Sequence, residues 1–425
     1  MNKQDVIVQK NGVLHIGEPC LSHVNGKCRV SAMVTAPDRK KEIYFEFDEE
    51  YAPYACVERC DPFVLLLFVY ALHDSLDIVS DAPMTERLYY QLTSYQIPVM
   101  AQLIDEYHSI SISCDLADEI EPIVHGRVAA FSGGVDSFYT VVAHLDNECK
   151  NHNLTHLVFN NVGALTKNQE ESERVFADKK AFLGAAADEL GLPLVAINTN
   201  MLELLSDYDE VITSPDLFKN MGCLCALKRL FRIFYWSSSG EGLDRFRVNY
   251  TDMDEYEAVN VSMVSFDYLP VYFFDFTASR LDKVRYIADH PVVQKYLSVC
   301  DGMNDSMCFK CTRTMVELMA IGKLEQFDSV FDVAWFKKHL VDRLAYHFGD
   351  RNEWSYGFCS ESLEACKQND VRIPLMVWPL AIFKYRPMLF LKRHLKNVKF
   401  LRSIYERFDL RTKLRFHVVK VGDRG

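Results

Sequence analysis

The sequence predicts an α/β protein: a doubly wound parallel sheet preceded by a mixed α+β module and followed by a helical extension. Three patterns indicate this. From residue 126, short apolar runs alternate with helical stretches, which is typical of parallel strands buried on both faces. A glycine-rich turn separates the first such run from the first helix, and from residue 328 apolar residues recur at helical spacing. We therefore expect three domains, at residues 1–120, 121–325 and 326–425.

The first domain begins with an expected β-hairpin. Residues 30–34 and, more clearly, 43–47 alternate between apolar and polar side chains, and the turn APDRK lies between them. The longest apolar run, Phe63 to Leu72, is far shorter than the ~20 residues of a membrane span, so it indicates a buried helix. No catalytic pattern occurs here, and we expect this domain to cover the substrate or to form a homo-oligomer. The other expected elements are helices near Asp61–Ala71 and Met84–Tyr95 and a strand near Ser109–Cys114.

The second domain alternates strands with helices, so its strands are expected to be parallel. In open sheets of this kind, ligands bind beyond the carboxyl ends of the strands. The expected strands are Arg127–Phe131, His156–Asn160, Leu194–Asn198 and Arg232–Ser237, and a helix from about Ser137 to Leu145 follows the first. A longer helix, Gln169–Leu190, is ended by the sequence GLP and is expected to bury Val175, Phe182, Ala186 and Leu190. The third domain is expected to end in a basic, amphipathic helix from Pro387 to about Phe408.

Composition excludes several classes of protein. The chain of 425 residues is about half apolar, so it can bury a substantial core. Its net charge of −12 hides a split, because residues 381–425 contain 13 Lys and Arg against 3 Asp and Glu. The acidic remainder argues against a surface that binds nucleic acid throughout, whereas the basic end suits a local anionic partner. Thirteen cysteines in so long a chain, and an N-terminus without an apolar core, indicate a reduced, cytoplasmic protein that does not enter membranes.

A hexapeptide between the first strand and the first helix of the second domain carries the strongest chemical signal. Its glycines let the backbone approach an anion, and its amides and the helix N-terminus direct positive dipoles toward that anion. Its hydroxyls can donate to phosphate oxygens, and its carboxylate suits a Mg²⁺ ion that bridges them. It is not a Walker loop, since no Gly-Lys-Ser/Thr follows, and it is not the dinucleotide fingerprint. The six residues are Ser132, Gly133, Gly134, Val135, Asp136 and Ser137.

This hexapeptide resembles the SGGxDS loop of the N-type ATP pyrophosphatases, also called the PP-loop superfamily. The resemblance implies an adenine nucleotide alpha hydrolase-like (HUP) fold that binds ATP with Mg²⁺. Members cleave ATP between the α- and β-phosphates and adenylate a carbonyl or carboxylate oxygen, and a nitrogen or sulfur nucleophile then displaces AMP. The resemblance also places Asn161 and Gly163, after the second strand, beside adenine and ribose. An ordinary strand-to-helix turn is an equal alternative for either residue.

Three cysteines in the segment VCDGMNDSMCFKCTRT indicate a metal site. Cys308 and Cys311 form a CxxC pair, whose spacing lets two thiolates bind one tetrahedral ion, although redox motifs share this spacing. Cys300, eight residues earlier, favours Zn²⁺, and Asp305 is the carboxylate placed to complete a Cys₃Asp set. The alternative is a group of three buried, reduced thiols.

The order of these motifs is similar to that in the 7-cyano-7-deazaguanine synthase branch of the superfamily. There the PP-loop precedes a Lys-containing helix and a four-cysteine zinc motif that Arg follows closely; Asp305 stands here in place of one cysteine. The resemblance covers roughly residues 126–325 and implies that Arg280 or Lys283 neutralises phosphate charge and that Arg313 contacts a phosphate or a substrate carboxylate. Alternatively, Lys283 is a solvated helix residue and Arg313 braces the zinc loop. The whole chain is closer to longer PP-loop proteins of bacterial biosynthetic or defence clusters, some of them queuosine-synthase-like.

Together these features predict an ATP-dependent ligase that releases AMP and pyrophosphate. It would adenylate a carboxylate or amide oxygen of a small molecule or a macromolecule, and ammonia or an amine would capture the adenylate. C–N bond formation is favoured over sulfur transfer because Cys223 and Cys225, the other closely spaced thiols, are expected in the core. Two alternatives stay open: a PP-loop protein that modifies nucleobases or nucleic acids, including by sulfur transfer or in phage defence, and a non-catalytic ATP-binding subunit. The expected catalytic residues are Asp136, Ser137, Arg280 and Lys283.

Overall fold

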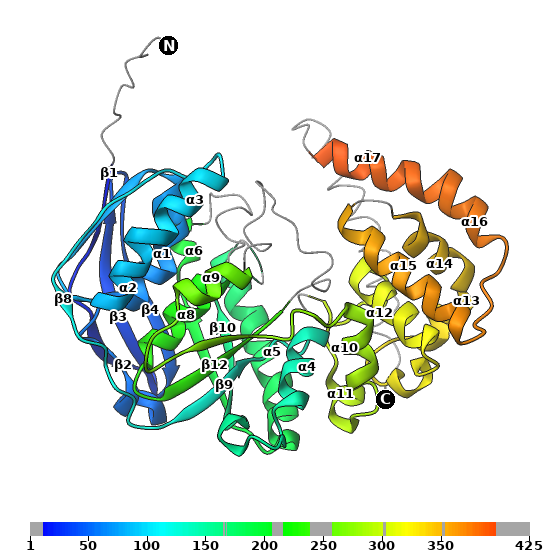
Figure 1. Cartoon of the computed structure of the whole chain (residues 1–425), viewed down its shortest axis with the longest axis horizontal. Coiled ribbons are helices and arrows are strands. Elements are labelled where there is room, and N and C mark those ends of the chain that lie inside the picture. Colours follow the sequence, from blue (N-terminus) through cyan, green and yellow to red (C-terminus); the bar gives the residue numbers. More distant parts are fainter. Residues whose placement is uncertain are drawn as a thin grey trace, which may run out of the picture. The chain divides into compact units, whose positions relative to one another are not determined.

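The computed structural model describes residues 12–164, 166, 168–205, 216–238, 257–300, 303–350 and 353–396, of which 353–356 and 392–396 as backbone. Backbone contacts divide the chain into two compact units, Met1–Asn304 and Asp305–Gly425 (Figure 1). The sequence predicts boundaries near residues 120 and 325. The backbone contacts give no division at residue 120, because strands before and after that residue belong to one sheet.

The N-terminal strands form a mixed part of that sheet, in which β3 pairs antiparallel with its neighbours and β5 pairs parallel with β1 and β7. β3 (Lys27–Ala36) and β4 (Arg39–Asp48) pair antiparallel along their whole length, which confirms the predicted hairpin. The strand expected near Ser109–Cys114 is shorter and comprises β7 (Ile112–Ser113). The other strands before residue 120 are β1 (Gly12–Ile16), β2 (Cys20–Val24) and β5 (Leu76–Ser80), with β6 (Met84–Thr85) and β8 (Leu116–Ala117) paired in a separate small sheet.

The apolar run near residue 65 forms a core helix, as predicted. It is α1 (Asp61–His73), in which every residue from Asp61 to Leu72 is buried. The second expected helix begins two residues late, because Met84 and Thr85 pair in a strand, and a π-helical turn interrupts it. Its pieces are α2 (Glu86–Gln91), the π turn η2 (Leu92–Gln96) and α3 (Ile97–Leu103); the short 3-10 helix η1 (Glu49–Tyr54) precedes α1.

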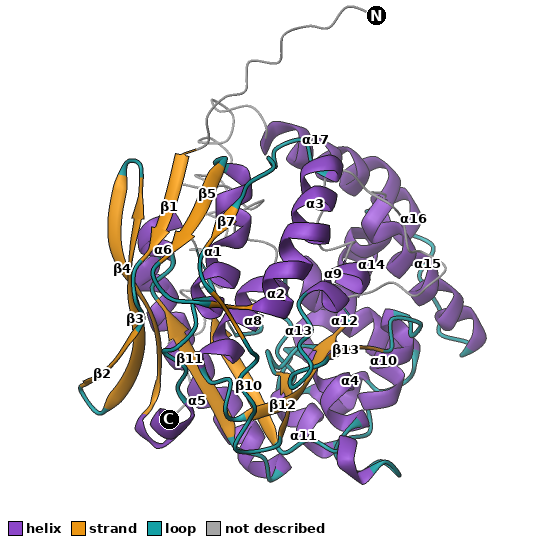
Figure 2. Ribbon diagram, turned by 60° about the vertical axis from the view of Figure 1, so that its left-hand side comes forward, coloured by secondary structure: helices purple, strands orange, loops and turns teal. Residues whose placement is uncertain are grey.

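Five parallel strands form the rest of the sheet, in the order β13-β12-β9-β10-β11. β11 then pairs antiparallel with β4, so the first unit contains one 11-stranded, mostly parallel sheet (Figure 2). This confirms the α/β class and all four strands expected after residue 126; the short fifth strand was not predicted. The strands are β9 (Gly126–Ala130), β10 (His156–Asn161), β11 (Leu194–Thr199), β12 (Phe231–Ser237) and β13 (Val271–Phe274).

The long helix α5 spans Gln169–Leu190, as predicted, but its buried face is not the predicted one. Of the four residues expected in the core, only Ala186 is buried; Val175, Phe182 and Leu190 are not. The face is rotated because two polar residues belong to it: the Ser172 hydroxyl donates to Asn161, and the Lys179 ammonium donates to the carbonyl of Cys300. Counting only apolar residues therefore misplaced the face. The buried residues are Ser172, Phe176, Lys179, Leu183, Ala186 and Ala187.

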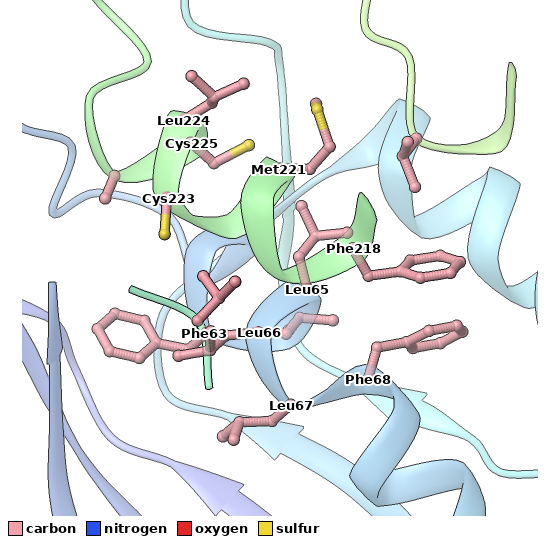
Figure 3. Packing of buried hydrophobic residues seen from close by; sticks show 14 of the residues in the cluster. Phe63, Leu65, Leu66, Leu67, Phe68, Phe218, Met221, Cys223, Leu224 and Cys225 are labelled. Atoms are coloured by element: carbon pink, nitrogen blue, oxygen red, sulfur yellow. The ribbon is translucent and has the colours of Figure 1, made fainter. Parts of the chain in front are cut away.

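The core of the first unit includes the crossing of α1 with α8 (Asp216–Ala226), shown in Figure 3. Phe68 and Phe218 pack with ring centroids 5.3 Å apart. Cys223 and Cys225 are buried on α8, as expected, and burial raises the pKa of both thiols. Further helices of this unit are α4 (Val135–Ala143), the 3-10 turn η3 (Lys150–His152), α6 (Leu202–Leu205), α9 (Glu257–Met263), α10 (Arg280–Ile287) and α11 (Pro291–Tyr296).

The α1–α8 crossing depends on the absence of a side chain at Gly222. A Cβ atom there would lie 2.7 Å from the carbonyl oxygen of Pro62 and 3.2 Å from the backbone nitrogen of Leu66. We expect Gly222→Ala to lower the free energy of unfolding by about 1–3 kcal/mol, because backbone atoms of α1 must move. Gly184→Ala is the control: nothing lies within 4 Å of its Cβ position in α5, so it should raise stability by about 0.5–1 kcal/mol. Urea unfolding of both variants tests this, and equal effects would contradict it.

The described part of the second unit is helical, as predicted. The expected final helix begins at Arg386, and its expected end near Phe408 lies outside the described residues. Within the described residues, no helix combines the length and apolarity that crossing a membrane requires. The helices are α12 (Phe309–Ala320), η6 (Leu324–Phe327), α13 (Val333–Lys338), α14 (Leu340–Gly349), α15 (Glu353–Gln368), α16 (Val377–Leu380), η7 (Ala381–Tyr385) and α17 (Arg386–Lys396).

Candidate functional site

The strand order places the glycine-rich loop at a topological switch point. From β9 the chain runs to β10 and β11 on one side, and then returns to β12 and β13 on the other side. The loops that follow β9 and β12 therefore diverge at the carboxyl edge of the sheet, which is where open α/β sheets bind ligands. The loop at residues 132–137 follows β9, and Ser238 follows β12.

The backbone of this loop leads directly into a helix N-terminus. Gly133 has a φ of +77°, and its carbonyl accepts a hydrogen bond from the Ser298 amide at 2.8 Å. Gly134 is the N-cap residue of α4 and has no side chain with which to cap the helix. The Ser137 hydroxyl donates to the Gly134 carbonyl at 3.0 Å, and the Gly134 amide donates to Ser132 Oγ at 3.4 Å. A helix start with glycine at the N-cap position suits an anion.

Two buried cations converge on the carboxylate of this loop. Arg280 Nη1 lies 2.8 Å from Asp136 Oδ2, and Lys283 Nζ lies 3.0 Å from Asp136 Oδ1. Both cations come from the first turn of α10, which packs against α4. That turn is fixed by a capping box between Ser279 and Asp282, so the spacing of three residues puts both side chains toward the loop. Lys283 is therefore not a solvated helix residue: its side chain is 1% exposed.

The two cations are more deeply buried than the carboxylate that they contact. The Asp136 side chain is 25% exposed, whereas those of Arg280 and Lys283 are 8% and 1% exposed. Lys283 also donates to the carbonyl and hydroxyl of Ser238, so its ammonium links α4 to the residue that follows β12. Two cations beside the start of a helix are groups of the kind that bind a phosphate.

Ser238 is a site residue that the sequence reasoning missed. The expected strand RIFYWS ends at Ser237, so a polar residue at the next position, after a strand of a parallel sheet, was the available signal. Ser237 itself bonds Thr140 of α4, with 2.8 Å between the two hydroxyl oxygens, and this contact joins the strand to the loop helix.

Asn161 lies in the interior of the unit and braces its elements. Its Nδ2 donates to Asn198 at 2.8 Å, its Oδ1 accepts from Ser172 at 2.8 Å, and its carbonyl accepts from Thr199 at 2.7 Å. These bonds tie β10 to β11 and to α5. Gly163 follows with a φ of +81° at the carboxyl edge of the same sheet.

Arg313 belongs to the second unit, on α12. It is buried, with its Nε 3.9 Å from Glu317 Oε1 and its guanidinium 4.3 Å from the ring centroid of Phe358. The contact with Phe358 connects α12 to α15, whereas Glu317 lies on α12 itself. His347, also buried in this unit, feels the same guanidinium: burial and then Arg313 lower the pKa of its imidazole to about 3.

The predicted metal ligands come together. One ligand atom from each of Cys300, Asp305, Cys308 and Cys311 lies within 4.8 Å of the other three. Cys308 is the N-cap residue of α12, where its Sγ accepts from the Cys311 amide at 3.4 Å. A helix N-terminus and amide donors stabilise thiolates.

The fourth ligand of this cluster is oriented by the backbone. Asp305 Oδ1 accepts from the amides of Met307 and Cys308, both at 2.8 Å, so the carboxylate is held toward the thiols. Three sulfur ligands and one oxygen ligand within one short segment suit tetrahedral Zn²⁺. We conclude that this cluster can hold such a metal.

Comparisons of the chain with protein-family models, with curated proteins and with solved structures gave no match. The geometry itself therefore supports two kinds of site in the described residues. One is the loop site at the sheet edge, where Asp136 meets Arg280 and Lys283, and the other is a cysteine-rich cluster that can hold a metal.

The conformation of the loop requires glycine at position 133. A Cβ atom there would lie 2.8 Å from Leu183 Cδ2, in addition to the strain of a positive φ. For the ATP binding proposed below, we expect Gly133→Ala to weaken the affinity at least about tenfold, because the loop amides must shift. Gly191→Ala is the control, since it has a similar φ of +70° and nothing within 4 Å of its Cβ position. Isothermal titration with ATP and Mg²⁺ measures both affinities, and an unchanged affinity of folded Gly133→Ala would contradict the expectation.

Proposed function

We propose that this protein is a PP-loop ATP pyrophosphatase that adenylates a carboxylate or amide oxygen, for capture by ammonia or an amine. The observation that carries the proposal is the convergence of Arg280 and Lys283 on Asp136 at the switch point. Two cations beside the N-terminus of α4 suit the pyrophosphate part of ATP. The fold assignment that belongs to this proposal is the adenine nucleotide alpha hydrolase-like, HUP-type core.

The proposed reaction assigns distinct roles to the residues of the loop site. The substrate oxygen attacks the α-phosphorus, the bond to the bridging oxygen breaks, and pyrophosphate leaves; a nitrogen nucleophile then attacks the acyl carbon and AMP leaves. Arg280 and Lys283 neutralise the charge that grows on the leaving pyrophosphate. Ser132, Ser137 and the loop amides orient the phosphates. Magnesium would supply further charge neutralisation, and the partly exposed carboxylate of Asp136 is of the type that holds it.

We favour a nitrogen nucleophile over a sulfur nucleophile because of the environment of the paired thiols. Cys223 and Cys225 are buried in α8, and burial raises the pKa of each thiol well above its ordinary value. A thiol of this kind stays protonated at neutral pH and is a poor nucleophile. The metal cluster is assigned a structural role, because four protein ligands leave no open position for a substrate.

The test is product formation from ATP. The purified protein is incubated with α-labelled ATP, Mg²⁺ and fractions of a cell extract, and AMP, pyrophosphate and altered metabolites are measured. AMP that appears only with a particular fraction and ammonia supports the proposal. ADP as the only product, or ATP binding without turnover in every fraction, would refute it and favour another class of ATPase or a non-catalytic subunit. Turnover that requires RNA or DNA, with a steep salt dependence, would favour the nucleic-acid-modifying alternative.

A further inference from the structure

A second group of metal-ligating side chains lies in the first unit, far along the chain from the cysteine cluster. His23 on β2, Cys28 on β3 and Glu49 at the start of η1 each offer a ligand atom within 4.8 Å of the other two. They provide nitrogen, sulfur and oxygen, a set that divalent zinc accepts. Nothing in the proposed ATP chemistry uses these residues.

The sequence of the hairpin turn creates the first half of this group. Asn25 and Gly26 both have positive φ, of 52° and 75°, which is the type I′ turn that Asn-Gly favours. This two-residue turn pairs Val24 with Lys27, so His23 lies directly opposite Cys28. The pair Val24–Lys27 closes the turn with hydrogen bonds, so the next pair, His23–Cys28, is of the kind without them, in which side chains approach most closely. The segment HVNGKC was thus the available sequence signal for a His–Cys pair.

The neighbouring strand supplies the third member. β4 pairs with β3 up to Asp48 opposite Lys27, and Glu49 follows immediately, beside the same end of the hairpin. Its Oε2 accepts from Cys28 Sγ at 3.2 Å, and its Oε1 lies 2.7 Å from His23 Nδ1. Cys28 Sγ lies 3.4 Å from His23 Nδ1. The paired strands β2 and β3 and the start of η1 therefore hold the three donors.

These distances are close to those of a metal site. With Zn–S of about 2.3 Å and Zn–N or Zn–O of about 2.0 Å, ligand atoms of a tetrahedral ion lie about 3.3–3.6 Å apart. Both distances from Cys28 Sγ agree with this within a few tenths of an ångström. The third is a short hydrogen bond between His23 and Glu49, whose side chains are 58% and 52% exposed and can separate slightly.

The electrostatics of the group also favour a cation. The Glu49 carboxylate lies against the Cys28 thiol, so the group without a metal already contains a formal negative charge beside the sulfur. An exposed His–Glu contact by itself contributes little to stability. A bound divalent ion would replace the thiol proton, which is released to solvent, and would join β2, β3 and the chain after β4.

We propose that His23, Cys28 and Glu49 form a second zinc site, with three protein ligands and one position open to water. Its donor set differs from the closed Cys₃Asp cluster. Three protein ligands plus water is the coordination of zinc sites that act on a substrate or exchange a ligand. The ligand class for the open position is a small oxygen or nitrogen donor.

The test is zinc content in a background without the cysteine cluster. Cys308→Ser is combined with His23→Gln, with Glu49→Gln or with the control Glu50→Gln, an exposed carboxylate outside the group. We expect about one zinc per chain in Cys308→Ser and in the Glu50→Gln control. In the variants that also contain His23→Gln or Glu49→Gln, the zinc affinity should fall by more than the roughly 10–100-fold that loss of an outer-shell partner causes. His23 and Glu49 are exposed, so their variants should fold, which circular dichroism checks.

Cobalt provides an independent readout. In the same background, Co²⁺ should give a sulfur-to-metal charge-transfer band that Cys28→Ser abolishes and His23→Gln shifts. A Cys308→Ser protein that retains no zinc and gives no such band, while its circular dichroism is unchanged, would overturn the proposal. The result is independent of the ATP chemistry, because neither readout requires turnover.

Discussion

Replacing Lys283 with methionine is expected to lower the rate of AMP formation by about 10²–10³-fold, the usual effect of removing one charge-stabilising donor. The ammonium lies 3.0 Å from Asp136 Oδ1 and donates to the Ser238 carbonyl, so it is held at the loop. Methionine preserves the buried volume, and Asp136 keeps its ion pair with Arg280. Release of labelled AMP, in the fraction that supports the wild-type protein, gives the rate.

The control for this variant lies on the same helix. Arg285→Gln removes a cation from α10 that is 41% exposed and paired with Asp282, and it should leave the rate unchanged. Arg280→Gln should resemble Lys283→Met, because the two cations share one carboxylate. A folded Lys283→Met protein with the wild-type rate would refute the assigned role and leave the cation as a purely structural partner of Asp136.

Zinc removal is expected to have the largest effect on stability. At free zinc about 1,000 times the Kd, binding stabilises the folded chain by about 4 kcal/mol, and a chelator removes this contribution. Cys308→Ser should have a lower thermal midpoint than the wild type and lose one zinc per chain. It removes the Cys308 sulfur, which is both a metal ligand in this prediction and the acceptor of the hydrogen bond from the Cys311 amide. Metal analysis and thermal unfolding, each with and without chelator, measure the two effects.

Cys149→Ser is the matched control, because this cysteine is exposed and belongs to neither metal group. It should keep the zinc content and the midpoint of the wild type. If Cys308→Ser also keeps both, the cluster is a group of reduced thiols, the alternative that the sequence leaves open. The second zinc site does not confuse this comparison, since its ligands are intact in both variants.

Local sequence was sufficient for the regular elements with strong patterns. The hairpin β3–β4, the apolar helix α1 and both ends of α5 agree with prediction, since alternation, apolar runs and terminal residues act within a few positions. The buried face of α5 was wrong, because Ser172 and Lys179 are buried through hydrogen bonds to distant residues. The spacing of apolar residues along the sequence contains no information about such partners.

Domain structure was the weaker part of the prediction. A change of pattern at residue 126 suggests a separate first domain, yet β4 pairs with β11 and makes one sheet of the two parts. Strand pairing between distant segments depends on loop closure and packing rather than on local propensity. For the same reason the short strand β13 was not predicted, because it is defined by its pairing with β12.

The sequence by itself determined the chemistry available to this protein: a hexapeptide suited to phosphates, cysteines spaced for a metal, and Arg280 and Lys283 one helical turn apart. It also contained the Asn-Gly turn that sets His23 opposite Cys28. Only the tertiary structure decided which of these groups meet. Asp136 and Lys283 are separated by 147 positions along the chain, and they are joined because the strand order returns β12 and α10 to the edge where β9 ends. Such a contact is decided by the packing of the whole sheet, which no local pattern records.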